Sequence, residues 1–514
     1  MAGEIPIPIP TLGLIKSVDR ESVPPSALAE AENWIYRDRH FRVRNGLTAL
    51  GSNTVSGRPT GIIHYDHSDG ALRTVLATAT GWYNFNYGTR AWTLLTGTAL
   101  TATTQQQAFR IFHKGTPSVS YLLGINGKDA PKKWDGNTAG YSDIAGSPPI
   151  ARAMLILNNQ LILGNLSSGI NVSPVGVDWS AFGDFDSGWG TQATNLRDTP
   201  GPIVFGEEMG NEHGALVKTD AAYRAIAQAG TVPFRFDWVK VPKDGGAAAN
   251  QAKCVIGDGR LVWLALNATL KVFDLNTVAD FGSDDARIQL QDTIDASLIG
   301  RSWMSYDSST SEVLVVYASK GGVGDPDMGL IISKNGSIYP MRWGGRKFST
   351  GSYARITRAT TIGDLKVNIG SIQKTLGELG ISSVVRETIA ADTSGQASYF
   401  SGNDDLGSPI SGVAETGLSA FANGGDFKTC KSISHRFNKP TDSQLVKVRV
   451  GFSRDGEERT LEEGQDIDIA SGETHVTGHR TTSRYLSMRM EVNATKPVIY
   501  RGSFVDAAPR GKWR

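Results

Sequence analysis

The sequence predicts an all-β protein whose body is a β-propeller of about six to eight blades, within the usual range for this fold. Short segments of alternating polar and apolar residues recur, for example RTVLATATGWYNF (73–85) and RLVWLALNATLKVFDL (260–275), and this alternation is typical of strands. The 514 residues include 59 glycines. This exceeds the usual ~7% and favours strands joined by tight turns. Strand clusters begin at intervals of roughly 45 to 50 residues, the length of a four-stranded blade.

Turn signals divide these strands into hairpins. The dipeptides Asn-Gly and Asp-Gly, which suit turns that need a positive φ, occur in WDGN (134–137), GDGR (257–260), SKNGS (333–337) and RDGE (454–457). Helical periodicity is scarce, and its best example, IGSIQKTLGEL (369–379), contains two glycines. Two or three β-sandwiches in series would give the same strand-and-turn pattern, so tandem sandwiches are the alternative fold.

Three regions follow from the places where these repeats begin. Residues 1–55 precede the first clear repeat, and we predict an N-terminal extension with a hairpin that serves assembly. We assign residues 56–425 to the propeller body, because strand clusters follow one another there at blade spacing. Residues 426–514 contain further alternating segments, and we expect them either to close the propeller or to form a small accessory β domain.

Composition argues against several function classes. The 52 Lys and Arg residues balance the 51 Asp and Glu residues, so no global charge draws the chain to nucleic acid or to a membrane surface. The two cysteines, Cys254 and Cys430, are too few for a disulfide framework and fit a reducing compartment. We see no signal peptide, and no apolar run approaches the ~18 residues of a membrane span. We therefore expect assembly in a cytoplasm.

Candidate chemical sites are few. In HYDH (64–67), His64 and Asp66 would face one side of a strand and His67 the other, so the three side chains would not converge on a metal. GGVGDPDMG (321–329) lacks the ligand spacing of a recognised calcium loop. The sequence has neither a Walker phosphate loop nor a nucleophile elbow. We predict no catalytic residue, no metal, no cofactor and no enzymatic activity.

Two loops are rich in small residues, PKDGGAAANQA (242–252) and KGGVGDPDMG (320–329). A loop of this composition could gate a channel, but an ordinary surface linker would look the same. We interpret both loops as surface linkers.

The most amphipathic stretch of the chain is NWIYRDRHFRVRNG (33–46). In a strand, Trp34 and Tyr36 lie on one face and Ile35 and Arg37 on the other. The segment therefore has an apolar stripe that needs to be buried and a cationic side that remains exposed. Three interpretations are open: a solvated hairpin edge, an interface with another subunit or an adaptor, and phosphate contact with DNA. We favour the interface, because aromatic residues and arginine commonly anchor interfaces. Its candidate residues are Asn33, Trp34, Tyr36, Arg37, Phe41, Arg42, Arg44 and Gly46.

The segment that contains this stretch, SVPPSALAEAENWIYRDRHFRVRNGLTALG (22–51), resembles the N-terminal segment of the tail nozzle and packaged-DNA stabilisation proteins of short-tailed bacteriophages. In that family an Asn, a strand, a tight turn and an Arg-x-Gly form a hairpin. Here Asn33 opens the hairpin, and Arg44, Asn45 and Gly46 end it. Two positions differ from the family pattern, because the turn DRH contains no glycine and Asn45 stands where proline is usual.

A second stretch, NVSPVGVDWSAFGDFDSGW (171–189), is similar to the family segment in which a strand ending Val-x-Trp-Ser is followed by a Gly-Asp loop and a Trp. The C-terminal segment TTSRYLSMRMEVN (481–493) is consistent with the closing strand of the family. The residues that match in the second stretch are Val177, Trp179, Ser180, Gly183, Asp184 and Trp189.

The resemblance implies a structural virion protein without catalytic activity. Such a protein is a subunit of the nozzle ring below the portal and adaptor, which extends the tail channel and retains packaged DNA until ejection. The ring is homo-oligomeric, a hexamer by analogy with the family. Its implied partners are the head–tail adaptor, tail fibre or spike and needle proteins, with passive contact to double-stranded DNA in the lumen. The alternative is a carbohydrate-binding or hydrolytic propeller of the tail, for which the sequence shows no converging set of carboxylates or histidines from several blades.

Overall fold

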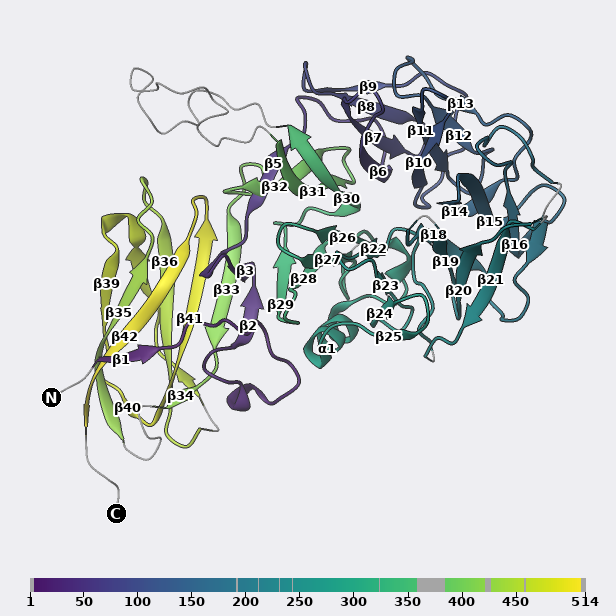
Figure 1. The fold of residues 1–514 in the computed structure, drawn as a ribbon. Coiled ribbons are helices and arrows are strands. Elements are labelled where there is room, and N and C mark those ends of the chain that lie inside the picture. Colours follow the sequence, from purple (N-terminus) through teal and green to yellow (C-terminus); the bar gives the residue numbers. More distant parts are fainter. Residues whose placement is uncertain are drawn as a thin grey trace.

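The computed structural model describes residues 4–190, 193–210, 212–230, 232–242, 244–322, 324–357, 384–420, 427–456 and 459–509. These residues form a β-propeller and, beside it, a β-sandwich (Figure 1). Within the described residues the propeller contains seven four-stranded antiparallel sheets, so the predicted fold class is confirmed and the blade number is seven. The helix candidate at 369–379 lies outside the described residues.

Blades 1 to 6 are each built from four consecutive strands. Blade 1 contains β6 (Pro59–Asp66), β7 (Leu72–Thr78), β8 (Trp82–Asn86) and β9 (Ala91–Leu94), and blade 2 contains β10 (Ala108–Lys114), β11 (Val119–Ile125), β12 (Lys132–Trp134) and β13 (Ser142–Asp143). Blade 3 contains β14 (Ala151–Leu157), β15 (Gln160–Leu166), β16 (Ser173–Trp179) and β17 (Ala193–Asn195), and blade 4 contains β18 (Ile203–Glu208), β19 (His213–Lys218), β20 (Ala222–Ala227) and β21 (Phe234–Val239). Blade 5 contains β22 (Lys253–Val255), β23 (Leu261–Leu264), β24 (Leu270–Phe273) and β25 (Val278–Asp280), and blade 6 contains β26 (Trp303–Asp307), β27 (Glu312–Tyr317), β28 (Met328–Ile332) and β29 (Ile338–Arg342).

Blade 7 closes the ring with strands from two distant parts of the chain. It contains β30 (Phe348–Thr357), β31 (Val384–Asp392) and β32 (Ala397–Gly402), and its outermost strand is β5 (Gly46–Ala49), which precedes blade 1 in sequence. Trp92 of blade 1 and Tyr399 of blade 7 share one buried cluster, so the last blade packs against the first.

Polar turns repeat between the third and fourth strands of the blades. The carboxylate of Asp135 in blade 2 accepts hydrogen bonds from the backbone N–H groups two and three positions further on, at 3.0 and 2.8 Å. Asp274 in blade 5 makes the same pair of bonds at 3.0 and 2.7 Å. These are Asx turns, in which the side chain replaces a backbone acceptor and fixes the chain reversal. The repeat supports the blade spacing that the strand clusters predicted.

The β-sandwich consists of two seven-stranded sheets in the described residues. Both sheets combine strands from the N-terminal and C-terminal ends of the chain. One sheet contains β1 (Glu4–Ile7), β3 (Trp34–Arg37), β4 (His40–Val43), β35 (Lys428–Phe437), β39 (Thr474–Gly478), β40 (Thr482–Ser483) and β42 (Ile499–Pro509). The other contains β2 (Leu28–Glu32), β33 (Ile410–Thr416), β34 (Ser419–Ala420), β36 (Leu445–Ser453), β37 (Thr460–Leu461), β38 (Gln465–Asp468) and β41 (Tyr485–Ala494).

The predicted domain boundaries need correction at both ends. Strands β2, β3 and β4 do not form a separate extension, because β2 pairs with β33 and the β3–β4 hairpin pairs through β4 with β42 of the sandwich. The C-terminal part of the sandwich begins with β33 at Ile410 and not at residue 426. The expectation failed because hairpin spacing identifies neighbours in sequence, whereas these strands find partners several hundred residues away.

Helical structure is limited within the described residues. The α-helix α1 (Asp284–Thr293) begins after Ser283, whose side chain accepts a hydrogen bond from the backbone N–H of Ala286 and so caps the helix. No helix of the described chain is both long and apolar enough to span a membrane. Short 3-10 helices occur at Arg20–Ser22, Ile299–Arg301 and Ile469–Ser471.

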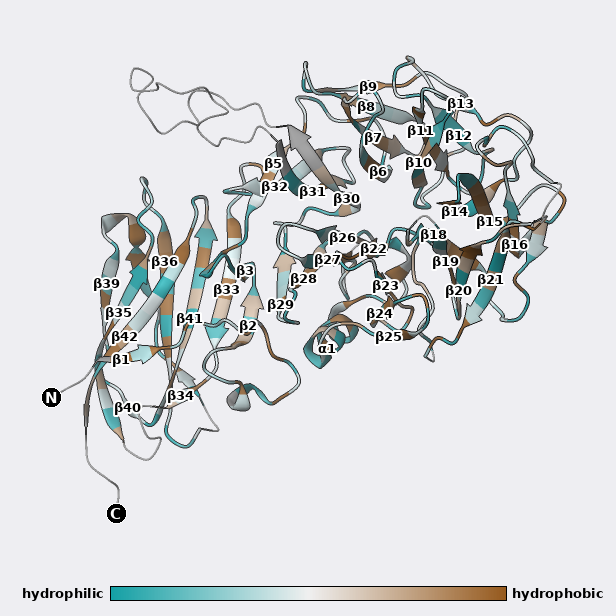
Figure 2. Cartoon of the chain, viewed as in Figure 1, coloured by the Kyte–Doolittle hydropathy of each residue, from teal (hydrophilic) through white to brown (hydrophobic). Residues whose placement is uncertain are grey.

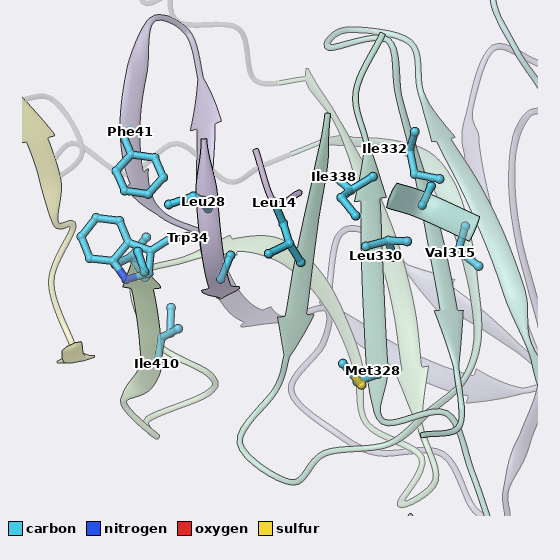
Figure 3. Close-up of a cluster of buried hydrophobic side chains, with 14 of the residues drawn as sticks. Leu14, Leu28, Trp34, Phe41, Val315, Met328, Leu330, Ile332, Ile338 and Ile410 are labelled. Carbon is cyan, nitrogen blue, oxygen red and sulfur yellow. The ribbon is translucent and has the colours of Figure 1, made fainter. Parts of the chain in front are cut away.

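One buried hydrophobic cluster joins the propeller to the sandwich. It contains Leu330 of blade 6, Leu14 and Leu28 of the N-terminal segment, and Ile410 of the sandwich (Figure 3). Hydrophobic residues are likewise concentrated in blade strands such as β15 and β19 (Figure 2). Because burial of apolar area is the main driving force for association, a continuous core favours one body over two hinged domains.

Candidate functional site

The hairpin at 34–43 has the expected ends and a two-residue turn. Strand β3 pairs with β4 in a register that places Trp34 opposite Val43 and Arg37 opposite His40. Asp38 and its neighbour at position 39 form the turn, and both have positive φ, at 53° and 63°. A turn of this kind matches the twist of the flanking strands, and residues other than glycine can adopt it at some conformational cost. The hairpin therefore forms without the turn glycine of the family pattern.

The aromatic residues of the hairpin lie inside the subunit. Trp34 and Phe41 are both 0% exposed, and their rings stack with centroids 5.0 Å apart. Tyr500 of the sandwich meets Phe41 edge to face at 6.4 Å (Figure 3 shows Trp34 and Phe41 within the cluster). The prediction that these two aromatics anchor an interface with another chain was wrong, because their area is already buried within their own fold.

The opposite face of β3 is also covered. Ile35 packs into a cluster of propeller residues that includes Trp303 and Trp343. Arg37 forms an ion pair with Glu312 of blade 6. The hairpin therefore lies between the sandwich and the propeller, and the cationic side expected to face solvent or a partner is used within the chain.

The remaining arginine of β4 is less fully paired. Arg42 lies 3.8 Å from the carboxylate of Asp38, and burial together with the neighbouring Arg37 lowers the pKa of Arg42. Asp38 and the next two residues, 39 and 40, are exposed at the tip of the hairpin. Tyr36 is half-buried against the cores of both domains. The exposed part of the hairpin is thus its tip, residues 38–40, which were not among the candidate interface residues.

Asn33 bonds to both domains at once. Its side-chain oxygen accepts from the backbone N–H of Arg342 in blade 6 at 2.9 Å and from Nε of Arg44 at 2.8 Å. Its side-chain amide donates to the carbonyl of Ser411 in the sandwich at 2.6 Å, and its backbone N–H donates to the carbonyl of Pro340 at 2.9 Å. Asn33 is buried and has a φ of 61°, a conformation that Asn adopts more readily than most residues.

Arg44 and Gly46 also take part in the contact between the propeller and the sandwich, which we call the joint. Arg44 binds Asp405 through two parallel hydrogen bonds of 2.9 and 2.6 Å, and Asp405 lies in the connection between the last blade strand and the sandwich. A Cβ atom on Gly46 would lie 2.0 Å from the carbonyl oxygen of Asp404, so only glycine fits there. The Asn and Arg-x-Gly of the pattern are therefore the residues that fix the propeller to the sandwich.

The second stretch that carries the resemblance, 171–189, lies in blade 3. Val177 and Trp179 are buried in a cluster shared with blade 4. The hydroxyl of Ser180 accepts from the backbone N–H of Leu161 at 2.9 Å. Asp184 pairs with Lys114 of blade 2, at 2.5 Å. Gly183 has a φ of 70°, and Trp189 donates to the carbonyl of Phe185 at 2.9 Å, so these six matching residues all shape blade 3 and its seams.

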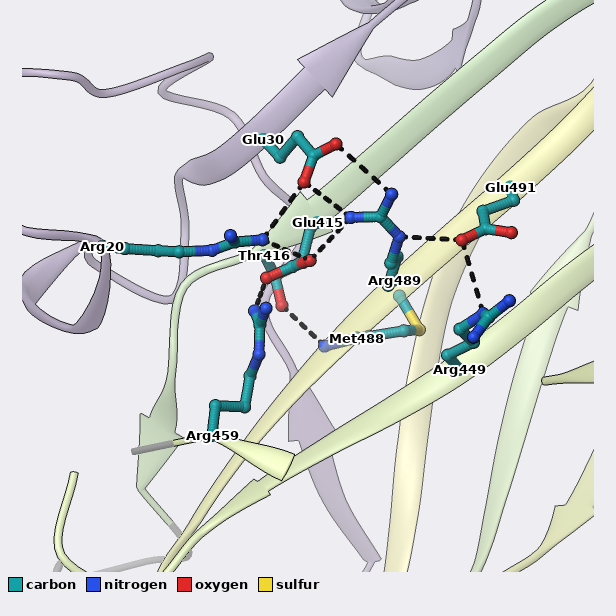
Figure 4. Close-up of polar contacts among 9 residues, drawn as sticks. All are labelled: Arg20, Glu30, Glu415, Thr416, Arg449, Arg459, Met488, Arg489 and Glu491. Carbon is teal, nitrogen blue, oxygen red and sulfur yellow. Dashed lines mark hydrogen bonds and ion pairs between the residues drawn. The ribbon is translucent and has the colours of Figure 1, made fainter. Parts of the chain in front are cut away.

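A cluster of arginines and glutamates ties the N-terminal segment to the sandwich. Glu415 of β33 is fully buried and pairs with Arg20, Arg489 and Arg459 (Figure 4). Glu30 of β2 pairs with Arg20 at 3.1 Å and with Arg489 at 2.6 Å. Although burial opposes the effect, these arginines hold the pKa of Glu30 below its ordinary value. Sequence inspection missed the cluster because its members come from four separate segments.

A pair of amide side chains, those of Gln251 and Asn250, links the inner strands of several blades. The side-chain amide of Gln251 donates to the carbonyls of Thr60 in blade 1 and Gln107 at the start of blade 2, at 2.8 and 2.9 Å. Its side-chain oxygen accepts from the hydroxyl of Thr350 in blade 7 at 2.7 Å, and its backbone carbonyl accepts from Met304 of blade 6 at 2.9 Å.

Asn250 extends this set to the remaining blades. Its amide donates to the carbonyls of Arg152 in blade 3 and Val204 in blade 4, at 2.7 and 3.2 Å. Together with Gln251 it contacts the inner edge of every other blade and leads directly into the first strand of blade 5. The interpretation of 242–252 as a surface linker was therefore wrong for its last residues, which form a hub on the propeller axis.

A compact set of charges lies beside this hub. Arg110 of blade 2 binds Glu207 of blade 4 at 2.6 Å and lies 3.2 Å from Glu208. The ammonium of Lys253 in blade 5 lies 3.5 Å from Glu207 and donates to the carbonyl of Asn250 at 2.7 Å. Burial lowers the pKa of Lys253 to about 8, despite the nearby Glu207 carboxylate. The sequence gives no signal for this set, because the four residues lie on three blades.

The other candidate chemical residues have structural partners. His64 shares a hydrogen bond with the hydroxyl of Thr74 at 2.9 Å, and His67 with the carbonyl of Asp135 at 2.8 Å. In the loop after residue 320, Asp325 pairs with Arg58 at 2.6 Å. Within the residues that the structure describes, no group of three or more His, Cys, Asp or Glu side chains is placed to hold a metal ion.

The chain was compared with family models, curated proteins and solved structures. No family model and no curated protein matches the chain. Among solved structures, Sqt1 from Saccharomyces cerevisiae is 11% identical over 72% of this chain and 99% of that chain, with a TM-score of 0.38. U3-55K is 7% identical over 60% of this chain and 88% of that chain, with a TM-score of 0.37. An exo-β-1,3-galactanase from Phanerochaete chrysosporium is 11% identical over 90% of this chain and 100% of that chain, with a TM-score of 0.27. At such TM-scores these likenesses carry no argument, and the propeller is evident from the sheets of the chain itself.

Proposed function

We propose that this chain is a non-enzymatic structural subunit of a bacteriophage tail nozzle, which forms a ring below the portal and adaptor and retains packaged DNA until ejection. The observation that carries the proposal is the role of Asn33, Arg44 and Gly46. These residues carry the resemblance to the nozzle family, and they fasten the propeller to the sandwich. A shared pattern at a buried joint supports a shared subunit architecture, because the joint fixes the relative orientation of the two domains.

A rigid joint suits a ring subunit that bears load. The propeller and the sandwich share one hydrophobic cluster, and a buried ion pair and an asparagine bridge them as well. A subunit held in one shape can present the same two surfaces to its neighbours around a closed ring. In place of the buried aromatics, we propose that the exposed hairpin tip, residues 38–40, contacts the adaptor or a neighbouring subunit.

The position of the chain in the phage particle tests the proposal. An epitope tag inserted in the exposed turn at 68–70, followed by immunogold electron microscopy, should place label in a ring at the tail. Particles that lack the chain should lose this ring and release their DNA. Label on the capsid, or intact DNA-filled particles without the chain, would contradict the proposal.

The hairpin tip has its own test. We expect the double substitution Arg39→Ala and His40→Ala to reduce incorporation into particles while the purified chain stays folded, because both residues are exposed. The matched control is Arg260→Ala, another exposed arginine in a turn of blade 5. We also expect the isolated chain to be monomeric at sub-micromolar concentration and to form rings on its adaptor, which mass photometry can measure.

A further inference from the structure

The propeller axis contains a pocket that the proposed function does not use. Gln251 and Asn250 line it, and their side-chain amides are fixed by bonds to five blades. The pocket is a cavity of about 390 Å³. A second hollow of about 270 Å³, which Asn250 also lines, lies against Arg152 and Val204 at the N-terminal ends of β14 and β18. Asn250 thus lines both hollows, and Gln251 lines the larger one.

The chemistry of the cavity walls is mixed. Ile62 and Met304 provide apolar surface, and Tyr306 and Tyr353 add two aromatic rings with polar hydroxyls. Glu207 binds both Arg110 and Lys253 through the same oxygen, Oε2. Among the contacts of the described residues, its second oxygen, Oε1, accepts no hydrogen bond and is free to accept one from a ligand.

The charges of this wall balance. Arg110 and Lys253 are matched by Glu207 and by Glu208, which lies 3.2 Å from Arg110. A charged ligand would leave one charge uncompensated in a partly buried site, and burial of an unpaired charge is costly. A ligand that is neutral and rich in hydroxyl groups avoids this cost, and it can exchange hydrogen bonds with a carboxylate and with tyrosine hydroxyls.

From these features we propose that the axial cavity binds a small neutral sugar, with Glu207 accepting from its hydroxyl groups and Tyr306 and Tyr353 packing against its ring. The size agrees, because small-ligand pockets start at roughly 300 Å³. Aromatic residues with a polar edge suit a ring that has apolar faces and a polar rim. The inference does not depend on assembly into a tail, because every residue involved lies in the propeller.

Ligand-observed NMR and calorimetry on the full chain test the proposal. The probes are neutral hexoses and their methyl glycosides, and the comparison between them distinguishes a free sugar from the terminal residue of a glycan. We expect saturable binding at millimolar concentration or below. A hexuronic acid and a hexosamine of the same ring stereochemistry should bind at least tenfold more weakly.

Two nearly isosteric variants locate the site. We expect Glu207→Gln and Tyr306→Phe each to weaken binding at least fivefold, whereas the exposed control Glu212→Gln should leave it unchanged. Circular dichroism verifies folding, and Tyr306→Phe provides the test on its own if Glu207→Gln destabilises the chain. No saturable binding of any neutral sugar to folded wild-type protein would overturn the proposal. Tighter binding of a charged analogue, or unchanged binding by folded Tyr306→Phe, would overturn it as well.

Discussion

Arg44 binds both carboxylate oxygens of Asp405, at 2.9 and 2.6 Å, in a place where the two side chains are 2% and 1% exposed. The partners are 361 positions apart in sequence. Arg44 follows the hairpin, and Asp405 lies in the connection from the propeller to the sandwich. The pair therefore fixes the segment that follows β32, the last strand of the propeller, to the segment that leads into β5, its first strand in sequence.

We expect Arg44→Met to lower the free energy of unfolding by about 3–5 kcal/mol, because it leaves the Asp405 carboxylate buried without its partner. Urea denaturation measures the change. The control Arg260→Ala breaks an exposed pair with Asp258 and should cost less than about 1 kcal/mol. Equal effects of the two substitutions would show that the buried pair does not stabilise the joint.

Trp34→Ala and Phe41→Ala should each destabilise the chain by about 3–5 kcal/mol, since both remove a fully buried ring. The double variant should lose less than the sum, because the two rings stack on each other. Thermal unfolding and near-UV circular dichroism report the loss. Leu94→Ala, at an exposed position, should change stability by less than about 0.5 kcal/mol. Stable, folded double variants would contradict the burial of these rings in the subunit core.

Gly46→Ala should destabilise the chain by about 1–3 kcal/mol or more, because the added methyl group would press on the backbone carbonyl of Asp404. Gly478→Ala is the matched control. Gly478 also lies in a strand, and no atom lies within 4 Å of a Cβ added there. The stability of the Gly478→Ala protein should therefore stay the same or rise by up to about 1 kcal/mol. Chemical denaturation distinguishes them, and a tolerated Gly46→Ala would refute the close approach.

Gln251→Ala should cost about 1–3 kcal/mol, because it leaves the carbonyl of Gln107 without its side-chain donor and removes one of the two donors to the carbonyl of Thr60, which keeps the backbone N–H of Gln107. Hydrogen exchange of backbone amides should increase in several blades at once, since the side chain links them. Gln228→Ala removes an amide that bonds to an exposed loop and should have little effect. Exchange that increases in blade 5 alone would contradict the role of Gln251 as a hub.

Acid should destabilise the sandwich through His435. Its ring nitrogens lie 2.8 Å from the Ser503 hydroxyl and 2.9 Å from the Thr477 hydroxyl. Burial, followed by the nearby His479 and His475, lowers the pKa of His435 from 6.5 to about 3. Between these values the unfolded state binds a proton that the folded state does not. The stabilisation is therefore complete above pH 6.5 and is lost as the pH falls toward 3.

Comparison with His435→Gln isolates this effect, because the carboxylates titrate equally in both proteins. Between pH 6 and pH 4 the wild type should lose up to about 1.4 kcal/mol more per pH unit than the variant. Urea denaturation at several pH values measures the difference. Parallel pH profiles would show that His435 does not contribute.

The sequence was sufficient for the blades because their rules are local. Alternation in segments such as 260–275 predicts strands, and turn residues such as Asp135 set their ends. The same local reasoning placed Trp34 on an apolar face of a strand, and Trp34 is buried. It could not identify what covers that face, because a strand face looks the same whether another subunit or a distant part of the same chain buries it.

By itself the sequence determined the strand period, the spacing of the blades and the hairpin from Asn33 to Gly46, since each depends on residues a few positions apart. The tertiary structure alone decided the blade number, the sandwich built from both chain ends, the Arg44–Asp405 pair and the Gln251 hub. Each of these features depends on contacts between residues that are tens to hundreds of positions apart in sequence. Local propensity does not specify such partners, because the closure of the ring and the burial of the joint select them together.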